Sequence, residues 1–429
     1  MAGTMSELQA IGATARKASR ELAKLNSAAK NQALHNIADA LMAHQSDVVA
    51  ANRKDYEAGK QVGLSEAVLD RLLLDGKRLE ALAVDVRDIS ALPDPIGEEF
   101  DTKVLPNGVR LARRRVPIGV IGAIYESRPN VTIDISALCI KSGNAAILRG
   151  GKEAIHSNTA LAELVRDAIA RAGLPRDAAQ LIKSTDRKLV DEMLKMKEHI
   201  DLLIPRGGAE LVRRVAAEAS MPAITGGIGV CHIYVDRSAD VEMAAAIAYN
   251  AKVQRPSTCN ALDTLLVHNE AAPKVLPEVA RRWGKAGVEI RCDSAALRIL
   301  QAVEGELDDG LKLTSAKPED WGQEFLALVA SVRVVGSLDE ALAHIQEYGS
   351  GHTEAIVTQD YEAAMRFVDQ VDAGAVLVNA STRLNDGGQF GLGAEVAIST
   401  SKLHARGPMG LRELTSYKWT ALGSGQVRP

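Results

Sequence analysis

One cysteine of the chain has the setting of a reactive thiol. Cys259 follows Gln254-Arg255-Pro256-Ser257-Thr258, a polar stretch ahead of an apolar segment that we expect to be a buried strand. A loop thiol beside an arginine is held partly as thiolate, the nucleophilic form of cysteine. Cys259 is therefore a candidate nucleophile, and an incidental loop thiol is the alternative. The other cysteines, Cys139, Cys231 and Cys292, are expected to be structural.

Two glycine pairs follow predicted strands and have cations beside them. Residues 148–153 read Leu-Arg-Gly-Gly-Lys-Glu, and residues 205–208 read Pro-Arg-Gly-Gly. Glycines let the backbone approach a ligand, a helix start supplies N–H groups, and the cations add charge, so both turns predict an anion cradle. Ordinary tight turns are the alternative. The cradle residues are Arg149, Gly150, Gly151, Lys152, Arg206, Gly207 and Gly208.

A third polar cluster follows a predicted strand at residues 375–378. Residues 383–395 combine glycines with Arg383 and Asn385, as a ligand-facing loop would, although a glycine-rich crossover has the same composition. His404 lies close to Arg406, where a hydrogen-bonded structural histidine is expected rather than a base. The GxGxxG fingerprint and the Walker loop are both absent, so a nucleotide would be bound in another way.

Composition excludes several classes of protein. Lys and Arg number 51 against 55 Asp and Glu, for a net charge of −4, which argues against nucleic-acid and anionic-membrane partners. Three Trp, 7 Tyr and 4 Phe are too few for base-stacking platforms. No apolar run approaches the ~18 residues that span a bilayer, the N-terminus lacks an apolar signal core, and no metal-ligand spacing occurs. We expect a soluble, cytoplasmic protein without a metal site.

The elements that must position these clusters form two runs of alternating strands and helices. Two such runs predict two open, mostly parallel α/β domains, whose ligands bind at the carboxyl ends of strands. The first run has strands at 118–124, 145–148, 179–182, 200–204 and 232–235, with helices at 131–141 and 153–172 and further helices between the later strands. The second has strands at 265–267, 289–291, 328–335, 355–357 and 375–378, with helices at 270–283, 338–347 and 360–370.

Two further regions lie before these runs. The first hundred residues have apolar positions three and four apart, which predicts packed helices. Near residue 100, alternating runs flank Asn107-Gly108, the strongest local signal for a hairpin. Because a lone two-stranded ribbon is marginal in water, we expect this hairpin to join a sheet.

These segments, in this order, resemble the aldehyde dehydrogenase superfamily and, within it, the family of gamma-glutamyl phosphate reductases, or glutamate-5-semialdehyde dehydrogenases. The most specific pieces are residues 116–122, 125–130, 148–153, 253–260, 379–383, 391–395 and 404–410. The resemblance implies an aldehyde-dehydrogenase-like α/β fold. It divides the chain into an NADP(H)-binding domain at 1–101 and 115–228, a catalytic domain at 229–409, and a β oligomerisation element at 102–114 and 410–429.

The resemblance also assigns roles to residues. Cys259 falls on the nucleophile position, and Arg128 falls near the position of the oxyanion-hole asparagine. Arg255 and Arg383 are expected to bind the substrate's phosphate and α-carboxylate, because of their charge and placement, and Asn379 is a further expected substrate-binding residue.

For the cofactor, Lys152 falls where the superfamily has a ribose-binding carboxylate. An ammonium group there favours a 2′-phosphate over a free 2′-hydroxyl, which indicates NADPH/NADP+. Arg149 falls on the position of a lysine in the same turn, and Glu324 on that of the glutamate that orients the nicotinamide ribose.

One departure from the superfamily indicates the reaction. Aldehyde dehydrogenases have Glu-Leu-Gly-Gly, whose Glu activates water, where this chain has Ile224-Thr225-Gly226-Gly227. Loss of the base favours acyl-phosphate chemistry, since water would destroy a thioester meant for phosphate exchange. We therefore expect NADPH-dependent reduction of L-glutamyl 5-phosphate to L-glutamate 5-semialdehyde and phosphate, the second step of proline biosynthesis from glutamate, through a Cys259 thioester.

Other functions stay open on the sequence alone. An NAD(P)-dependent aldehyde dehydrogenase or an acyl-CoA reductase of the same superfamily is the alternative enzyme, and a silent dinucleotide-binding or scaffold protein is the alternative class. The resemblance implies a homodimer or a tetramer, and it leaves open a direct contact with a separate glutamate 5-kinase that would deliver the labile acyl phosphate.

Overall fold

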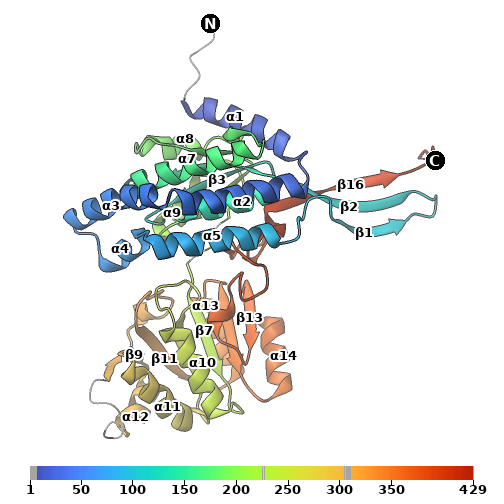
Figure 1. Cartoon of the computed structure of the whole chain (residues 1–429). Helices are drawn as coiled ribbons and strands as arrows, with labels where there is room; N and C mark the ends of the chain where they lie inside the picture. The colour runs from blue at the N-terminus through green and yellow to red at the C-terminus, as the bar shows by residue number, and fades with distance from the viewer. Residues whose placement is uncertain (1–6, 225, 227, 304, 306–310, 429) are drawn as a thin grey trace. The chain divides into compact units, whose positions relative to one another are not determined.

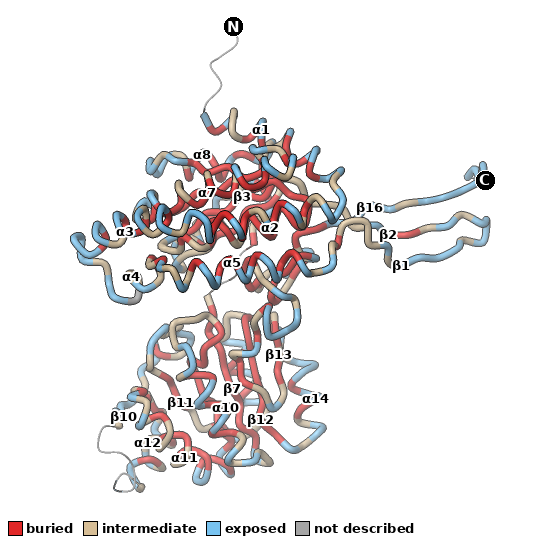
Figure 2. The backbone as a smooth tube through the Cα atoms, viewed as in Figure 1, coloured by how far each residue is buried: buried red, intermediate tan, exposed pale blue. Residues whose placement is uncertain are grey.

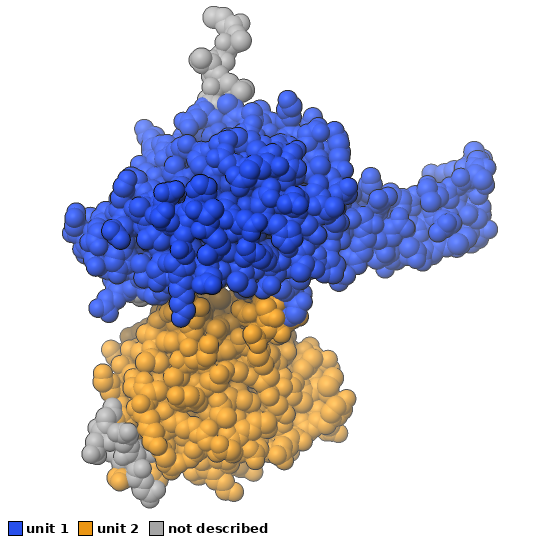
Figure 3. All heavy atoms as spheres, in the orientation of Figure 1, with its two compact units in different colours: residues 1–225, 391–397, 409–429 blue, residues 226–390, 398–408 orange. Residues whose placement is uncertain are grey.

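The computed structural model describes residues 7–224, 226, 228–303, 305 and 311–428 (Figure 1). The chain forms two compact units, coloured separately in Figure 3. The first contains residues 1–225, 391–397 and 409–429, and the second contains residues 226–390 and 398–408. The sequence analysis assigns 391–397 to the catalytic domain; in the structure this segment belongs to the first unit, where Gly393 lies against Leu92.

The first unit is built on a parallel sheet with the strand order β5-β4-β3-β6. Because both faces of this sheet are covered, β3 and β4 are buried along their whole length. Tyr125 is paired with Gly150 on one side and with Arg206 on the other, so the carboxyl ends of three strands meet at one edge. The strands are β3 (Val120–Tyr125), β4 (Ala145–Gly150), β5 (Ala179–Leu181) and β6 (Leu202–Arg206).

Helices pack on this sheet in layers. α6 (Val131–Lys141) and α7 (Ile155–Arg171) contact the strands and each other, and α1 (Glu7–Leu22) packs directly against β3, β4 and β5. An outer layer of helices packs against α6 and α7, as the apolar periodicity of the first hundred residues predicts. It consists of α2 (Ser27–Ala43), α3 (Gln45–Gln61) and α5 (Gly76–Ala91); α4 (Glu66–Leu72), α8 (Lys188–Met193) and α9 (Ala209–Glu218) complete the unit.

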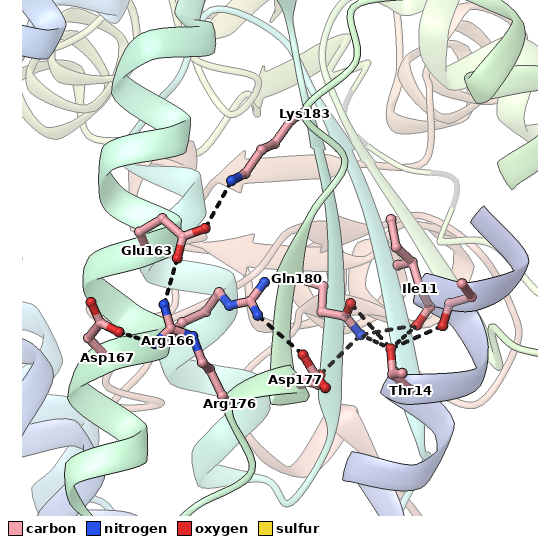
Figure 4. A network of polar contacts seen from close by, with 10 residues as sticks. Ile11, Thr14, Glu163, Arg166, Asp167, Arg176, Asp177, Gln180 and Lys183 are labelled. Carbon is pink, nitrogen blue, oxygen red and sulfur yellow. Dashed lines mark hydrogen bonds and ion pairs between the residues drawn. The ribbon is translucent and has the colours of Figure 1, made fainter. Parts of the chain in front are cut away.

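A buried glutamine ties α1 to the edge strand β5 (Figure 4). Gln180 Nε2 donates hydrogen bonds to the Ile11 carbonyl and to Thr14 Oγ1, each at 3.0 Å. Beside it, Glu163 pairs with both Arg176 and Lys183 on the surface. The polar contacts of Gln180 therefore join the first helix to the edge of the sheet.

Three antiparallel strands of the first unit form an exposed ribbon, which we call the arm (Figures 1 and 2). The Asn107-Gly108 hairpin prediction is confirmed, with a connection over residues 105–109 that is closed by the Leu105 N–H donating to the Val109 carbonyl. A strand from the end of the chain pairs with the second hairpin strand. The arm strands are β1 (Glu99–Val104), β2 (Arg110–Pro117) and β16 (Thr415–Leu422).

The second unit is built on a seven-stranded parallel sheet with the order β10-β9-β11-β8-β7-β12-β13. Alternate residues face opposite sides: Ile233 packs in the core beneath α10–α12, whereas its neighbour Tyr234 packs with α13 and α14. The strands are β7 (Cys231–Val235), β8 (Leu262–His268), β9 (Glu289–Cys292), β10 (Lys312–Ser315), β11 (Val329–Val335), β12 (Thr353–Val357) and β13 (Ala375–Val378). The helices are α10 (Val241–Val253), α11 (Ala272–Lys285), α12 (Ser294–Gln301), α13 (Leu338–Tyr348) and α14 (Tyr361–Gln370).

Short elements complete the chain. β14 (Ile398–Ser399) and β15 (Gly407–Pro408) form a two-stranded antiparallel pair. Single 3₁₀ turns occur at η1 (Lys152–Ala154), η2 (Arg176–Ala178), η4 (Pro318–Asp320), η5 (Thr382–Leu384) and η6 (Arg412–Leu414). The predicted α/β class with mostly parallel sheets is confirmed. The sequence analysis misses the short strands β10 and β14 and the helices α10 and α12. No helix among the described residues is both long and apolar enough to cross a membrane.

Candidate active site

A pocket opens at the carboxyl edge of the first sheet. Its volume is about 380 Å³, and both predicted cradles contribute to its lining, through Arg149, Gly151 and Lys152 on one side and Gly208 on the other. The two glycine turns are far apart in the sequence, and they meet because β4 and β6 flank β3 in the sheet. The structure therefore brings together the two turns that the sequence analysis treats separately.

Two glutamates occupy the glycine turns. Glu153 folds back over Gly151, where a Cβ would overlap its carboxylate, and its Oε1 accepts hydrogen bonds from the Ser127 N–H at 2.6 Å and the Ser127 hydroxyl at 2.8 Å. Glu126 accepts a hydrogen bond from the Gly208 N–H at 2.9 Å. Carboxylates of the chain therefore lie against the glycine backbone in both turns, where we expect the close approach of a ligand phosphate. Local sequence signals do not reveal this arrangement.

The pocket also gathers cations. Arg149 is 8% exposed and donates to the carbonyls of Gly150 and Thr185, whereas its Nε is buried without a partner among the described residues. Burial lowers the pKa of Arg149, an effect that nearby Glu153 opposes and Arg187 strengthens. Lys152 and Arg187 are exposed, and neither side chain forms an ion pair with a described residue. Unpaired positive charge in a concave site suits an anionic ligand.

Arg128 lies in the turn between β3 and α6. It is half-buried, and it follows Ser127, which has φ +47°. The positive φ is one that a serine seldom adopts, and the two hydrogen bonds to Glu153 stabilise it. Arg128 is thus attached to the same edge of the first sheet as the cofactor candidates.

Cys259 lies in the second unit, in the loop between α10 and β8, and is partly exposed. Cys231 and Cys292 of the same unit and Cys139 of the first unit are buried. Burial raises the pKa of the thiols of Cys139 and Cys231, and that of Cys292 to about 12. These three cysteines have the buried positions expected from the sequence, and Cys259 alone among the described cysteines lies on an accessible loop.

Two arginines accompany the Cys259 loop. Arg383 Nε donates to Gln254 Oε1 at 2.9 Å, and its Nη1 donates to Asn260 Oδ1, so this guanidinium bonds residues on both sides of the cysteine. Burial lowers the pKa of Arg383, and the positive charge of Arg255 lowers it further. The structure therefore brings Arg255, Arg383 and Cys259 together.

Asn379 is not brought to this loop. It directly follows β13 and has φ +53°, and its side-chain amide donates to the Thr358 carbonyl and accepts from the Thr358 N–H, each at 2.9 Å. The strands are parallel, so Asn379 lies at the carboxyl edge of the second sheet, whereas the Cys259 loop precedes β8 at the amino edge. The expectation that ligands gather at carboxyl ends fits the first unit's pocket but not this loop. Substrate binding by Asn379 stays a prediction.

Glu324 is linked to the Cys259 loop by way of Gly229. Its Oε1 accepts a hydrogen bond from the Gly229 N–H at 2.9 Å, and Gly229 in turn packs against the Cys259 peptide group. Ile224 is buried, and Thr225 and Gly227 of the same motif lie outside the described residues. His404 is exposed, and its neighbour Arg406 pairs with Asp372.

Several residues of these sites are missed by the sequence analysis. Glu126, Glu153 and Arg187 line the pocket, and Gly229 and Cys231 contact the Cys259 peptide. Arg187 follows a predicted strand, which is a usable signal for a pocket residue. Nothing local marks Gly229, because its role depends on a contact with a distant segment. In the described part of the chain, no three His, Cys, Asp or Glu side chains gather in a way that could hold a metal ion.

Comparison with known proteins places the chain in a family. The model of the aldehyde dehydrogenase family matches residues 1–295 and 316–420. The gamma-glutamyl phosphate reductase of Dehalococcoides mccartyi strain CBDB1 is 58% identical over 428 residues, which cover 100% of both chains. That of Roseiflexus castenholzii is 56% identical over 99% of this chain and 100% of its own.

A solved structure agrees with these matches. The crystal structure of gamma-glutamyl phosphate reductase from Thermotoga maritima superposes with a TM-score of 0.94 at 43% identity, covering 99% of this chain and 100% of that one. The chain therefore belongs to the aldehyde dehydrogenase family, in the branch of the gamma-glutamyl phosphate reductases.

Proposed function

We propose that this protein catalyses the NADPH-dependent reduction of L-glutamyl 5-phosphate to L-glutamate 5-semialdehyde and phosphate. The observation that carries the proposal is full-length similarity to relatives named gamma-glutamyl phosphate reductase, joined to an accessible Cys259 flanked by Arg255 and Arg383. An acyl phosphate is an anionic electrophile, and a thiol beside two guanidinium groups suits it.

Cys259 is the nucleophile of the proposed reaction. Its thiolate attacks the acyl carbon, the C–S bond forms, and the C–O bond to phosphate breaks to leave a thioester and free phosphate. Arg255 and Arg383 attract the phosphate and the α-carboxylate of the substrate, and Asn379 is a further candidate ligand. The Cys259 N–H and Arg128 donate to the oxyanion that develops on the carbonyl oxygen.

The cofactor would be held by the first unit's pocket. The buried Nε of Arg149 lacks a partner among the described residues, and Lys152 and Arg187, which form no ion pair within them, supply charge for a 2′-phosphate, so the residues present fit NADPH. Gly150, Gly151, Arg206, Gly207 and Gly208 shape the two turns, and Glu324 is the candidate ligand of the nicotinamide ribose. When bound, the cofactor supplies the hydride that converts the thioester to the aldehyde level, after which the Cys259 thiol is released.

The residue at position 224 favours phosphate exchange over hydrolysis. Ile224 provides an apolar side chain at the position where aldehyde dehydrogenases carry their water-activating glutamate, and it is 1% exposed. Without a general base for water, the thioester persists long enough for reduction or for attack by phosphate.

The test is the reverse reaction. NADP+ reduction with glutamate 5-semialdehyde is expected to require inorganic phosphate, and arsenate is expected to replace it. Cys259→Ala is expected to abolish the rate while NADPH binding, followed by fluorescence titration, stays within about two-fold of wild type. Phosphate-independent oxidation, or turnover by the Cys259→Ala protein, would contradict the proposal.

The setting of the enzyme is part of the proposal. A cytoplasmic location and a homodimer or tetramer formed through the arm agree with a biosynthetic reductase of this family. The labile acyl phosphate must come from a kinase that phosphorylates the glutamate side chain, and direct contact with a separate glutamate 5-kinase would shorten its exposure to water.

A further inference from the structure

The Cys259 loop is held through its backbone by a segment that precedes β7. The Cys231 thiol donates a hydrogen bond to the Cys259 carbonyl at 3.1 Å. Gly229 lies so close to the same carbonyl that a Cβ at this position would overlap its oxygen. Residues 229–231 therefore form a wall against which the peptide group of the cysteine rests.

This wall is fastened to a third segment by two carboxylates. Glu324 accepts the Gly229 N–H at 2.9 Å. Asp263, which is 2% exposed, accepts the N–H of Phe325 at 3.0 Å and that of Cys231 at 3.5 Å. Glu324 is thus bonded directly to Gly229 at one end of the wall. Its neighbour Phe325 is bonded, through Asp263, to Cys231 at the other end.

The wall has few other polar anchors among the described residues. The Val230 N–H donates to Ser350 Oγ at 2.9 Å, and the backbone N–H groups of Gly229 and Cys231 donate to Glu324 and Asp263. The Cys231 thiol also lies 3.9 Å from His352 Nδ1. The Nζ of the fully buried Lys252 lies 3.7 Å from Oδ1 of Asp263. The Asp263 carboxylate therefore has a counter-charge at a fixed position. Asp263 belongs to a rigid buried pair, whereas Glu324 is half-buried and reaches the wall from an irregular segment.

We infer that Glu324 is a positioning residue for Cys259: by accepting the Gly229 N–H it holds the 229–231 wall against the Cys259 carbonyl and so fixes the nucleophile before any cofactor binds. This inference rests on the proposed role of Cys259 and adds to the cofactor contact that the family resemblance gives Glu324. A residue that only orients a nicotinamide ribose would leave the cofactor-free nucleophile unchanged.

Acylation without cofactor separates the two roles. With p-nitrophenyl acetate as the probe, the burst of p-nitrophenolate reports transfer of the acetyl group to the Cys259 sulfur. Glu324→Ala is expected to slow this burst about 10- to 100-fold, because a misplaced nucleophile loses that much rate. Glu324→Gln keeps an oxygen acceptor for the Gly229 N–H and is expected to recover at least half of the rate. Glu319→Ala, an exposed glutamate of the same segment, is the matched control and should leave the burst unchanged.

Hydrogen exchange of the cofactor-free protein provides the second measurement. In Glu324→Ala, peptides that cover residues 229–231 and 254–260 are expected to exchange about ten-fold faster than in wild type, and peptides of β3 should not change. An unchanged burst, or faster exchange at 229–231 without a change at 254–260, would overturn the inference. A wild-type protein without any Cys259-dependent burst would count against the proposed function instead, and the exchange result would still decide the positioning role.

Discussion

A first residue-scale prediction concerns the charge of Lys152, to which we attribute the proposed preference for NADPH. The Lys152 ammonium lines the same pocket as Arg149 and forms no ion pair with a described residue. Lys152→Glu is expected to raise the KM for NADPH about 10- to 100-fold and to improve relative use of NADH, because a carboxylate repels a 2′-phosphate and accepts a 2′-hydroxyl. Steady-state kinetics with both cofactors measure the change. Lys17→Glu, an exposed change on α1, is the control, and an unaltered NADPH preference would contradict the assignment.

A second residue-scale prediction concerns a buried imidazole. Burial, aided by His232 and Arg333, lowers the pKa of His344 from 6.5 to about 3, and Arg333 donates to its Nδ1 at 2.9 Å. Between pH 6.5 and 3 the native state therefore binds fewer protons than the unfolded state. The free energy of unfolding is therefore unaffected by the titration of His344 above pH 6.5. Below that pH it declines as the pH falls, by up to about 1.4 kcal/mol per pH unit.

His344→Gln is expected to flatten this dependence. The variant is less stable than wild type at pH 7.5, because its packing against Trp321 is lost, yet its free energy of unfolding falls less between pH 6.5 and 4.5. Urea unfolding at several pH values, followed by tryptophan fluorescence, measures both slopes. The control is His44→Gln, a change at an exposed histidine, which should leave the pH dependence of the free energy of unfolding as in wild type. Equal slopes for wild type and His344→Gln would refute the argument.

At the scale of elements, the periodicity of apolar residues predicts those helices and strands whose bounds depend on local sequence alone. The helix at 131–141 and the strand at 375–378 have the predicted bounds, because apolar runs between clear turn signals set both ends. β10 and β14 are short and partly polar, so no pattern marks them. The wall at residues 229–231 and the carboxylates in the glycine turns could not be predicted, since each depends on contacts between segments distant in sequence.

One side chain of the edge strand β5 makes hydrogen bonds to α1. Gln180 is 6% exposed and supplies both hydrogen bonds that join β5 to Ile11 and Thr14. Gln180→Leu is expected to lower the free energy of unfolding by about 1–3 kcal/mol, because the Ile11 carbonyl loses its side-chain donor in a partly buried site. Urea titration measures the loss, and hydrogen exchange should localise it to α1. Gln32→Leu, which removes only a surface bond to Asn36, is the control; equal losses would exclude a specific anchor.

At the scale of the whole molecule, the arm exposes large aromatic side chains to solvent. Tyr417 and Trp419 are 45% and 51% exposed, and Arg113 lies between their rings at 4.8 and 4.7 Å. β16 ends the strand order of the arm, so one of its edges has no neighbouring strand among the described residues. Exposed aromatic side chains on an open edge strand are typical of an association surface. The arm of a second copy fits this surface, because two identical strands can pair about a two-fold axis.

This reasoning predicts the behaviour of an arm variant. Wild type is expected to sediment as a dimer or a tetramer, and Tyr417→Ser combined with Trp419→Ser should shift the protein toward monomer at the same concentration, since the apolar contact is lost. Analytical ultracentrifugation measures the mass, and unchanged urea unfolding would show that the fold survives. Tyr361→Ala removes an aromatic side chain that is 77% exposed on α14 and should leave the mass unaltered. A monomeric wild type, or a double variant with the wild-type mass, would rule out the arm as the association surface.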